Sequence, residues 1–304
     1  MEPKDGFVAA NGIRLHYLEW GGDGPPLMLL HATGFLARLW EPIAIELSAR
    51  FHVYALDARG HGDSDKPVLS PETTRRGESR DEGPAPAGAY GWEGLAADLM
   101  GFLDALGLAG VPIVGHSSGA AGAVRLAALR PEYVSAVVLI EPTVFPPMPG
   151  EGSDQRKEQL AAGAAKRRMV WDSREELVDV YRQRRAFAGW CQDVLRLFAE
   201  HGAFERADGR IELKCPGEIE AELYRNSLSP DVWDLLPRVR CPALVIRGEN
   251  TEPLLAFVAG GVAGRIPDAR LVTIAGGSHF VPMERPDEIA SEALAFLERA
   301  VAAA

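Results

Sequence analysis

The sequence has few cysteines, no long apolar run and no excess of positive charge. Its three cysteines, Cys191, Cys215 and Cys241, are odd in number and widely spaced, which excludes a disulfide framework and a zinc-site signature. The first residues lack the basic and then apolar pattern of a secretory signal, and no apolar run approaches transmembrane length. We therefore expect a cytoplasmic protein with free thiols, without a metal or other cofactor.

Acidic residues outnumber basic ones, and the formal net charge is −11 at pH 7. This charge disfavours binding to nucleic acid or to a membrane surface, because both are anionic. The length of 304 residues suits an α/β core with an inserted subdomain. The expected partner is a small-molecule substrate, and the chain is expected to be a monomer or a homodimer.

Short apolar runs alternate with helical patterns along most of the chain. Strands are expected over residues 7–10, 13–20, 27–30, 51–56, 111–114, 136–140, 243–246 and 271–274. Helices are expected over residues 39–49, 98–106 and 286–301, and in an alanine-rich run that ends at Leu129. This alternation predicts the α/β class, with a mostly parallel central sheet flanked by helices.

Two segments interrupt the alternation. Residues 66–89 are rich in proline, charge and glycine and predict a solvated, mobile loop. Residues 143–236 are rich in helix formers, arginines and aromatics, and they predict a helical cap inserted between two core strands. The core would then comprise residues 1–142 and 237–304. The charged side chains of the cap are interpreted as its solvated face.

The most informative motif is Gly-His-Ser-Ser-Gly at residues 115–119, between an apolar run and a helical run. It has the form G-x-S-x-G in the strand–turn–helix setting of a nucleophile elbow. On so tight a turn the central serine has a strained backbone, and its small neighbours prevent clashes. Ser117 is therefore the expected nucleophile.

A serine hydroxyl needs a base that removes its proton and a carboxylate that orients the base. His279 is the expected base, because it follows a late strand and a flexible Gly-Gly pair. The acid has three candidates. Glu249 and Glu252 follow the strand that ends near residue 246, and Glu141 follows the strand after the elbow helix. All three lie at carboxyl ends of expected strands, where open α/β sheets place their sites.

The negative oxygen that forms during acyl transfer needs backbone N–H donors, which together make an oxyanion hole. One donor is expected from Ser118, at the start of a helix, and the other from Thr33, in the loop after the strand at 27–30. Apolar residues expected to line the substrate pocket are Phe35, Trp40, Val144, Phe145 and Phe280. Each of them could equally be part of the core.

Four motifs in this order resemble those of the alpha/beta-hydrolase superfamily, in its capped esterase and lactonase-like branch. They are the oxyanion loop at 31–35, the segment Asp-Ala-Arg-Gly-His-Gly-Asp-Ser at 57–64, the elbow, and Ser-His-Phe at 278–280. The resemblance implies structural roles for Asp57 and Arg59. Ala32 departs from the usual glycine of the oxyanion loop, and a glutamate stands where an aspartate is usual in the late acid loop.

The resemblance and the serine nucleophile together imply hydrolysis through an acyl-enzyme intermediate. Relatives that hydrolyse epoxides or haloalkanes use aspartate at the elbow, and dienelactone hydrolases use cysteine. The leading hypothesis is a Ser-His-Glu hydrolase of a small, largely apolar carboxylic ester or lactone. One alternative is a C–C bond hydrolase of a ring-cleavage product, with cap arginines on a substrate carboxylate. The other is a ligand-binding receptor with slow turnover.

Overall fold

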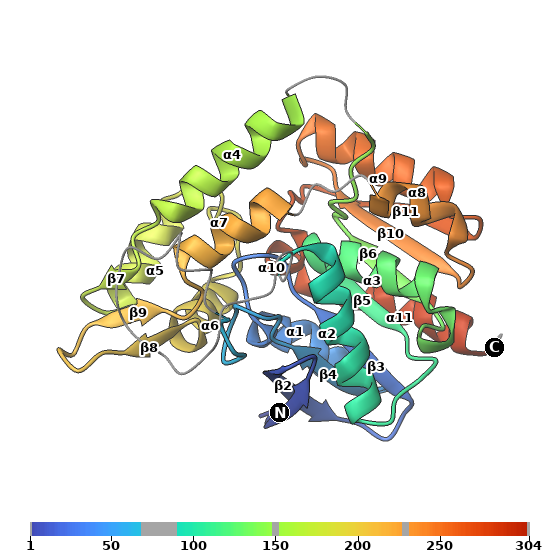
Figure 1. The fold of residues 1–304 in the computed structure, drawn as a ribbon, viewed down its shortest axis with the longest axis horizontal. Coiled ribbons are helices and arrows are strands. Elements are labelled where there is room, and N and C mark those ends of the chain that lie inside the picture. Colours follow the sequence, from blue (N-terminus) through green and yellow to red (C-terminus); the bar gives the residue numbers. More distant parts are fainter. Residues whose placement is uncertain (1, 68–89, 148–151, 227–230, 303–304) are drawn as a thin grey trace.

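A computed structural model describes residues 2–67, 90–147, 152–226 and 231–302 (Figure 1). The loop predicted over 66–89 lies almost entirely outside these described residues. In the described part of the chain, no helix is both long and apolar enough to cross a membrane. The cytoplasmic location stays a prediction.

The core is an eight-stranded sheet with the order β1-β2-β4-β3-β5-β6-β10-β11. The strands are β1 (Lys4–Ala10), β2 (Ile13–Gly21), β3 (Pro26–Leu30), β4 (His52–Leu56), β5 (Ile113–His116), β6 (Val137–Ile140), β10 (Ala243–Gly248) and β11 (Ala269–Ile274). β2 pairs antiparallel with β1 and β4, and all other neighbours are parallel. The predicted mostly parallel sheet is confirmed. Asn11 and Gly12 have φ of 51° and 77° at the β1–β2 turn, as the Asn-Gly pair favours.

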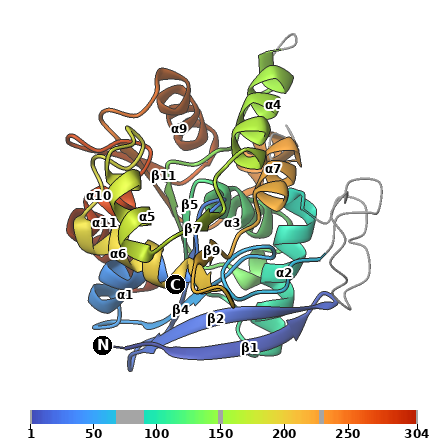
Figure 2. The same ribbon diagram turned by 90° about the vertical axis from the view of Figure 1, so that its left-hand side faces the viewer.

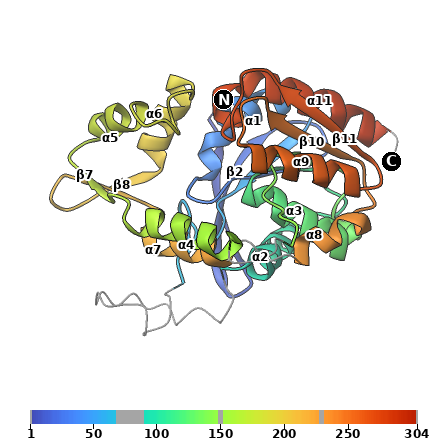
Figure 3. The same cartoon turned by 90° about the horizontal axis from the view of Figure 1, so that it is seen from above.

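Helices cover both faces of the sheet (Figure 3). One face packs against α1 (Glu41–Leu47) and α11 (Pro286–Ala302). The other packs against α2 (Trp92–Ala105), α3 (Ser118–Leu129), α8 (Asp231–Leu235) and α9 (Pro253–Arg265). Short helices complete the core at η1 (Ala37–Trp40), η2 (Pro131–Tyr133), η3 (Leu236–Arg238) and α10 (Val281–Glu284).

The sequence patterns did not reveal α9. Its sequence is almost entirely apolar and contains three glycines, so no polar face distinguishes the buried side of the helix from the exposed side. Gly261 lies so close to the Trp233 ring that a Cβ there would be 2.4 Å from it. This close packing of α9 against α8, which no sequence pattern encodes, explains the glycine.

The segment between β6 and β10 contains α4 (Gly152–Ala165), α5 (Arg174–Arg182), α6 (Gln192–His201) and α7 (Gly217–Asn226). It also contains a three-stranded antiparallel sheet of β7 (Val170–Trp171), β8 (Ala203–Glu205) and β9 (Ile211–Leu213). The predicted cap is therefore mainly helical, and its small sheet was not predicted from the sequence. Strands of two or three residues are too short for alternation to show in a sequence.

The cap elements lie beyond the carboxyl ends of the parallel strands (Figures 1 and 2). Helices α4 and α7 run side by side, and α5, α6 and the small sheet form a second group (Figure 2). Trp171, Tyr181 and Phe198 of the cap share one apolar cluster with Phe35 and Leu36 of the loop after β3. This packing holds the cap over the end of the sheet at which the predicted site residues lie. The exact core and cap boundaries stay a prediction.

Candidate active site

Ser117 lies in a strained turn between β5 and α3. Its backbone has φ 55° and ψ −110°, a conformation that L-residues rarely adopt. The turn closes only because its neighbours are glycines: a Cβ on Gly115 would lie 2.6 Å from the Gly119 backbone. A Cβ on Gly119 would lie 2.4 Å from the carbonyl oxygen of Leu30 in β3. The turn therefore has the strand–turn–helix geometry of an elbow, and the role of Ser117 as nucleophile stays a prediction.

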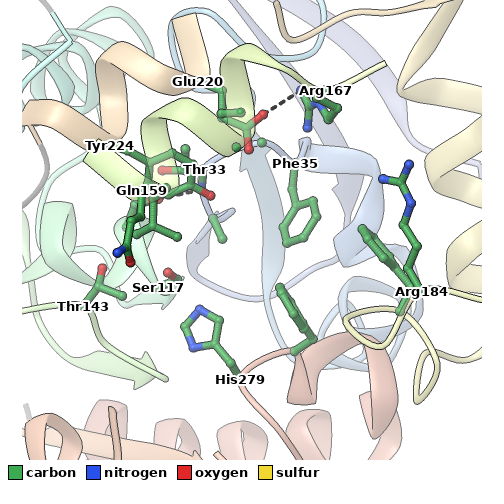
Figure 4. A pocket seen from close by; sticks show the side chains of 18 of the residues that line it. Thr33, Phe35, Ser117, Thr143, Gln159, Arg167, Arg184, Glu220, Tyr224 and His279 are labelled. Atoms are coloured by element: carbon green, nitrogen blue, oxygen red, sulfur yellow. Dashed lines mark hydrogen bonds and ion pairs between the residues drawn. The ribbon is translucent and has the colours of Figure 1, made fainter. Parts of the chain in front are cut away.

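Glu141 and His279 meet beside this serine. Glu141 directly follows β6 and also has a left-handed backbone, with φ 47°. Its Oε2 lies 3.2 Å from Nδ1 of His279 and accepts a 2.7 Å hydrogen bond from the Thr251 hydroxyl, while its Oε1 accepts one from the Gly248 N–H. The carboxylate is buried, and the imidazole is partly exposed to the cavity. In Figure 4 the Ser117 hydroxyl and the His279 ring face each other.

The two later glutamates do not occupy this position. Glu252, at the start of α9, is largely exposed and forms a 2.9 Å ion pair with Arg156. Glu249 accepts a 2.9 Å hydrogen bond from the Gly276 N–H. The structure thus corrects both as candidate partners of His279. Glu141 is the glutamate that contacts His279 because it directly follows β6, which pairs in parallel with β10.

The oxyanion loop differs from the expectation in one contact. The Thr33 N–H does not point freely into the cavity but donates a 2.8 Å hydrogen bond to Oγ of Ser118. The Ser118 N–H lies in the first turn of α3, where N–H groups have no acceptor within the helix. Thr33 and Ser118, the two predicted oxyanion donors, are therefore in contact through the Ser118 side chain, and their role as donors stays a prediction.

Two buried histidines hold the oxyanion loop. Nε2 of His61 accepts the Gly34 N–H at 2.9 Å, and Nε2 of His31 accepts the Ala58 N–H at 3.0 Å. Each ring must then carry its proton on Nδ1, which donates to a backbone carbonyl. Burial lowers the pKa of both rings, that of His61 to about 3. Both imidazoles are therefore neutral and structural at pH 7.

The His279 loop is held from two further sides. Nε2 of His116 hydrogen-bonds the His279 carbonyl oxygen at 2.8 Å, so His116 is the donor. Burial lowers the pKa of His116 to about 3 and keeps it neutral. Glu284 accepts hydrogen bonds from both the N–H and the hydroxyl of Ser278. Sequence reasoning missed Glu284, because the only available signal was an ordinary glutamate near a helix start.

Ser117 and His279 line a cavity of about 770 Å³ between the sheet and the cap. Phe35, Phe145 and Phe280 contribute to its wall, as predicted. Trp40 and Val144 do not, because both side chains are buried in the core clusters on either side of the sheet. Hydrophobic type alone could not distinguish a core residue from a pocket residue.

The cavity wall is more cationic than the sequence suggested. It includes Arg156, Lys166, Arg167, Arg168 and Arg184, against two carboxylates, Glu220 and Glu252. This finding corrects the view that the cap's charged residues belong only to its solvated face.

Three of these cations are neutralised by carboxylates. Arg167 pairs with the buried Glu220 at 2.7 Å, as Figure 4 shows. Glu176 binds Arg168 through both oxygens, and Arg156 pairs with Glu252. For Lys166 and Arg184 there is no carboxylate partner among the residues that the structure describes.

Arg184 lies beside an aromatic surface, with its guanidinium carbon 4.7 Å from the centre of the Tyr181 ring. Such stacking fixes the plane of a guanidinium while leaving its N–H groups available to a ligand. The cavity wall therefore contains Ser117 and His279 together with two cations that suit an anionic group.

One cluster in the described ranges has the spacing of a metal site, formed by His16, Asp57 and Asp63. Its atoms are already bonded: Asp57 accepts from Nδ1 of His16 at 2.7 Å and from the backbone N–H groups of Ala37 and Asp63. Asp57 thus ties together β2, η1 and its own loop. Its contacts agree with the structural role implied by the resemblance.

Comparison with known proteins identifies the family. The model of the alpha/beta hydrolase family matches residues 27–293, which is most of the chain. The protein therefore belongs to the alpha/beta hydrolase family, and the fold above is the fold of that family.

Two known proteins are similar to this chain over most of their length. The N-formylmaleamate deformylase of Pseudomonas putida is 30% identical over 93% of this chain and 92% of its own. The 2-(acetamidomethylene)succinate hydrolase of Mesorhizobium japonicum is 29% identical over 88% and 85%. A crystal structure of E-2-(acetamidomethylene)succinate hydrolase superposes with a TM-score of 0.80 at 26% identity, covering 98% of this chain and 100% of that one.

Proposed function

We propose that this protein is a serine hydrolase that cleaves an N-acyl bond in a small substrate bearing at least one carboxylate. The observation that carries the proposal is the pair of cations, Arg184 and Lys166, in the same cavity as Ser117 and His279. The names of the two relatives support it. N-formylmaleamate and 2-(acetamidomethylene)succinate both denote carboxylates with an acyl group on nitrogen.

In the proposed mechanism, Oγ of Ser117 attacks the acyl carbon while its proton passes to the ring of His279. Glu141 stabilises the imidazolium through Nδ1, at the 3.2 Å contact. The C–N bond then breaks, and His279 gives its proton to the leaving nitrogen. Water attacks the acyl-enzyme with His279 as base, which releases the acid and returns a proton to Ser117.

The substrate carboxylate would bind Arg184, with Lys166 adding positive charge. Arg156, Arg167 and Arg168 contribute less, because carboxylates of the protein already neutralise them. A guanidinium binds a carboxylate through two parallel hydrogen bonds, which also fix the orientation of the substrate. This binding would position the acyl group near Ser117.

This proposal replaces the leading hypothesis from the sequence. A small, largely apolar ester or lactone makes no use of unpaired cations in the cavity wall. The comparisons favour the first alternative, a carboxylate-bearing ring-cleavage product held by cap arginines, except that the bond to be broken is C–N rather than C–C. Sustained multiple turnover would count against the receptor alternative.

The test is steady-state hydrolysis of N-formylmaleamate and of 2-(acetamidomethylene)succinate, followed by release of formate or acetate. Methyl esters of the same compounds serve as substrates without a carboxylate charge, and p-nitrophenyl butyrate represents apolar esters. We expect kcat/KM to be highest for a free carboxylate, and Ser117→Ala to abolish turnover. A preference for p-nitrophenyl butyrate over every carboxylate would refute the proposed substrate class.

Arg184→Gln identifies the carboxylate site. We expect KM for the carboxylate substrate to rise about 10- to 100-fold with little change in kcat. The reason is that the lost charge-assisted hydrogen bonds stabilise the bound substrate and the transition state equally. The methyl esters should be insensitive to the change. Arg185→Gln is the matched control, because Arg185 is a cap arginine outside the cavity wall. Equal effects of the two variants would exclude Arg184 as the carboxylate ligand.

A further inference from the structure

The side chain of Ser118 takes a position that the motif did not predict. Its Oγ accepts the Thr33 N–H at 2.8 Å, and it lines the cavity next to Ser117. The Ser118 hydroxyl donates to no acceptor among the residues that the structure describes. A hydroxyl group has one donor and two acceptor positions, so this donor is available to a ligand.

The position of this hydroxyl is set by backbone contacts. A Cβ on Gly119 would lie 2.4 Å from the carbonyl oxygen of Leu30 and 2.8 Å from that of His31. The end of β3 and the start of α3 are therefore in direct contact, which fixes the Thr33 N–H relative to the Ser118 side chain. Ser118 thereby brings two donors to one place, its N–H at the helix start and its O–H.

We propose that the Ser118 hydroxyl is a catalytic residue that donates a hydrogen bond to the oxyanion. The Thr33 N–H then acts through Ser118, by holding the hydroxyl and polarising its O–H bond. The donors to the oxyanion would be the N–H and the O–H of one residue. The proposal rests on the proposed role of Ser117 as nucleophile but not on the identity of the substrate.

Acyl transfer requires oxyanion donors that are already in position. As Ser117 attacks, the carbonyl oxygen gains a full negative charge, which must be met by donors already in place. If the Thr33 N–H were to bind the oxyanion directly, it would first have to break its bond to Ser118. A hydroxyl that is already hydrogen-bonded and free to donate needs no such rearrangement.

The decisive experiment is Ser118→Ala, which removes the hydroxyl and keeps the N–H. The rate of acyl-enzyme formation is measured with p-nitrophenyl acetate in a stopped-flow burst, alongside the Ki of a methyl trifluoromethyl ketone, whose adduct with serine carries an oxyanion. We expect acylation to slow by about 10- to 100-fold, somewhat less than for a typical lost oxyanion donor because the freed Thr33 N–H substitutes in part. The ketone Ki should rise by a similar factor, with the Kd of the ester within twofold of wild type.

Three further variants serve as comparisons for Ser118→Ala. Ser118→Thr restores the hydroxyl and should recover most of the rate, and Ser118→Cys, with a weaker donor of similar size, should be intermediate. Ser48→Ala removes an exposed hydroxyl outside the cavity wall and should leave the acylation rate unchanged. If Ser118→Ala is unfolded at the assay temperature, the Cys variant decides, because a rate equal to wild type would contradict the proposal.

The outcomes separate this proposal from the proposed function. An acylation rate in Ser118→Ala that equals or exceeds that of wild type would overturn the proposed role of the Ser118 hydroxyl. The hydroxyl would then serve only as the hydrogen-bond acceptor of the Thr33 N–H. If Ser117→Ala still forms the acyl-enzyme, or if the wild type never does, the nucleophile assignment fails and this proposal with it. A burst that depends on Ser117 but not on Ser118 refutes the present inference alone.

Discussion

The Glu141 carboxylate lies 3.2 Å from Nδ1 of His279, although 138 positions separate the two residues in the sequence. The contact is possible because β6, which precedes Glu141, pairs with β10, and β10 pairs with the strand that leads into the His279 loop. Both Glu141 and Ser117 have positive φ, so two of the three residues in this arrangement have strained backbones. Such strain is concentrated at functional sites.

We expect Glu141→Gln to reduce kcat/KM by about 10²- to 10⁴-fold, because the amide neither stabilises the imidazolium nor selects its tautomer as a carboxylate does. Steady-state kinetics with the best substrate of the panel above measures the effect. Glu249→Gln and Glu252→Gln are the matched controls, and each should keep kcat within a fewfold of wild type. A larger loss for Glu252→Gln than for Glu141→Gln would contradict the proposed role of Glu141.

Gly34→Ala should impair catalysis by displacing the oxyanion loop. Gly34 has φ 84°, and a Cβ there would lie 2.8 Å from a carboxylate oxygen of the buried Glu220. We expect a fall in kcat together with a stability loss of about 1–2 kcal/mol from the left-handed backbone. Gly107→Ala is the control, because Gly107 also has a positive φ but no atom near its Cβ position. That variant should lose stability and keep kcat, and equal activity losses would argue against a local effect at Gly34.

Asp98→Asn should destabilise the fold strongly. Asp98 binds the buried Arg59 through both carboxylate oxygens, which ties α2 to the loop after β4. Without the negative charge Arg59 stays buried and unpaired, at a cost of about 3–5 kcal/mol in the free energy of unfolding. Urea denaturation measures this loss. Glu132→Gln, in the exposed pair with Arg130, should have little effect, and similar losses for both variants would show that burial is not the cause.

The folded state should lose stability as the pH falls from about 6.5 towards 3. Burial lowers the pKa of His61 and His116 to about 3, below the ordinary value of 6.5. In this window the unfolded chain therefore binds more protons than the folded chain, so the free energy of unfolding decreases with falling pH. Above pH 6.5 these rings are neutral in both the folded and the unfolded chain, so they no longer make the free energy of unfolding depend on pH.

Urea denaturation at pH 7, 5.5 and 4 measures this dependence, with an expected slope of about 1.4 kcal/mol per pH unit for each histidine. His61→Gln keeps an acceptor for the Gly34 N–H but cannot titrate, so its slope should be smaller than that of wild type. An identical slope in the variant would exclude His61 as a source of the acid sensitivity.

Local patterns were sufficient for the features that depend on neighbouring residues in the chain. The alternation of apolar runs and helices predicted the mostly parallel sheet, because parallel strands are buried on both faces and need crossover helices. The glycines around Ser117 predicted the elbow, since only they permit so tight a turn. The Asn-Gly pair at residues 11 and 12 favours the tight β1–β2 turn, because both residues have positive φ there.

Contacts between distant segments were decided only by the tertiary structure. Three glutamates follow suitable strands, and the order of strands in the sheet alone brings Glu141 to His279. The hydrogen bond between Thr33 and Ser118 likewise depends on how the β3 loop packs. The packing of the cap decides which of its arginines meet a carboxylate, and among the described residues Arg184 meets none. A linear sequence determines which side chains are available, whereas folding determines which of them meet and which charges stay unpaired.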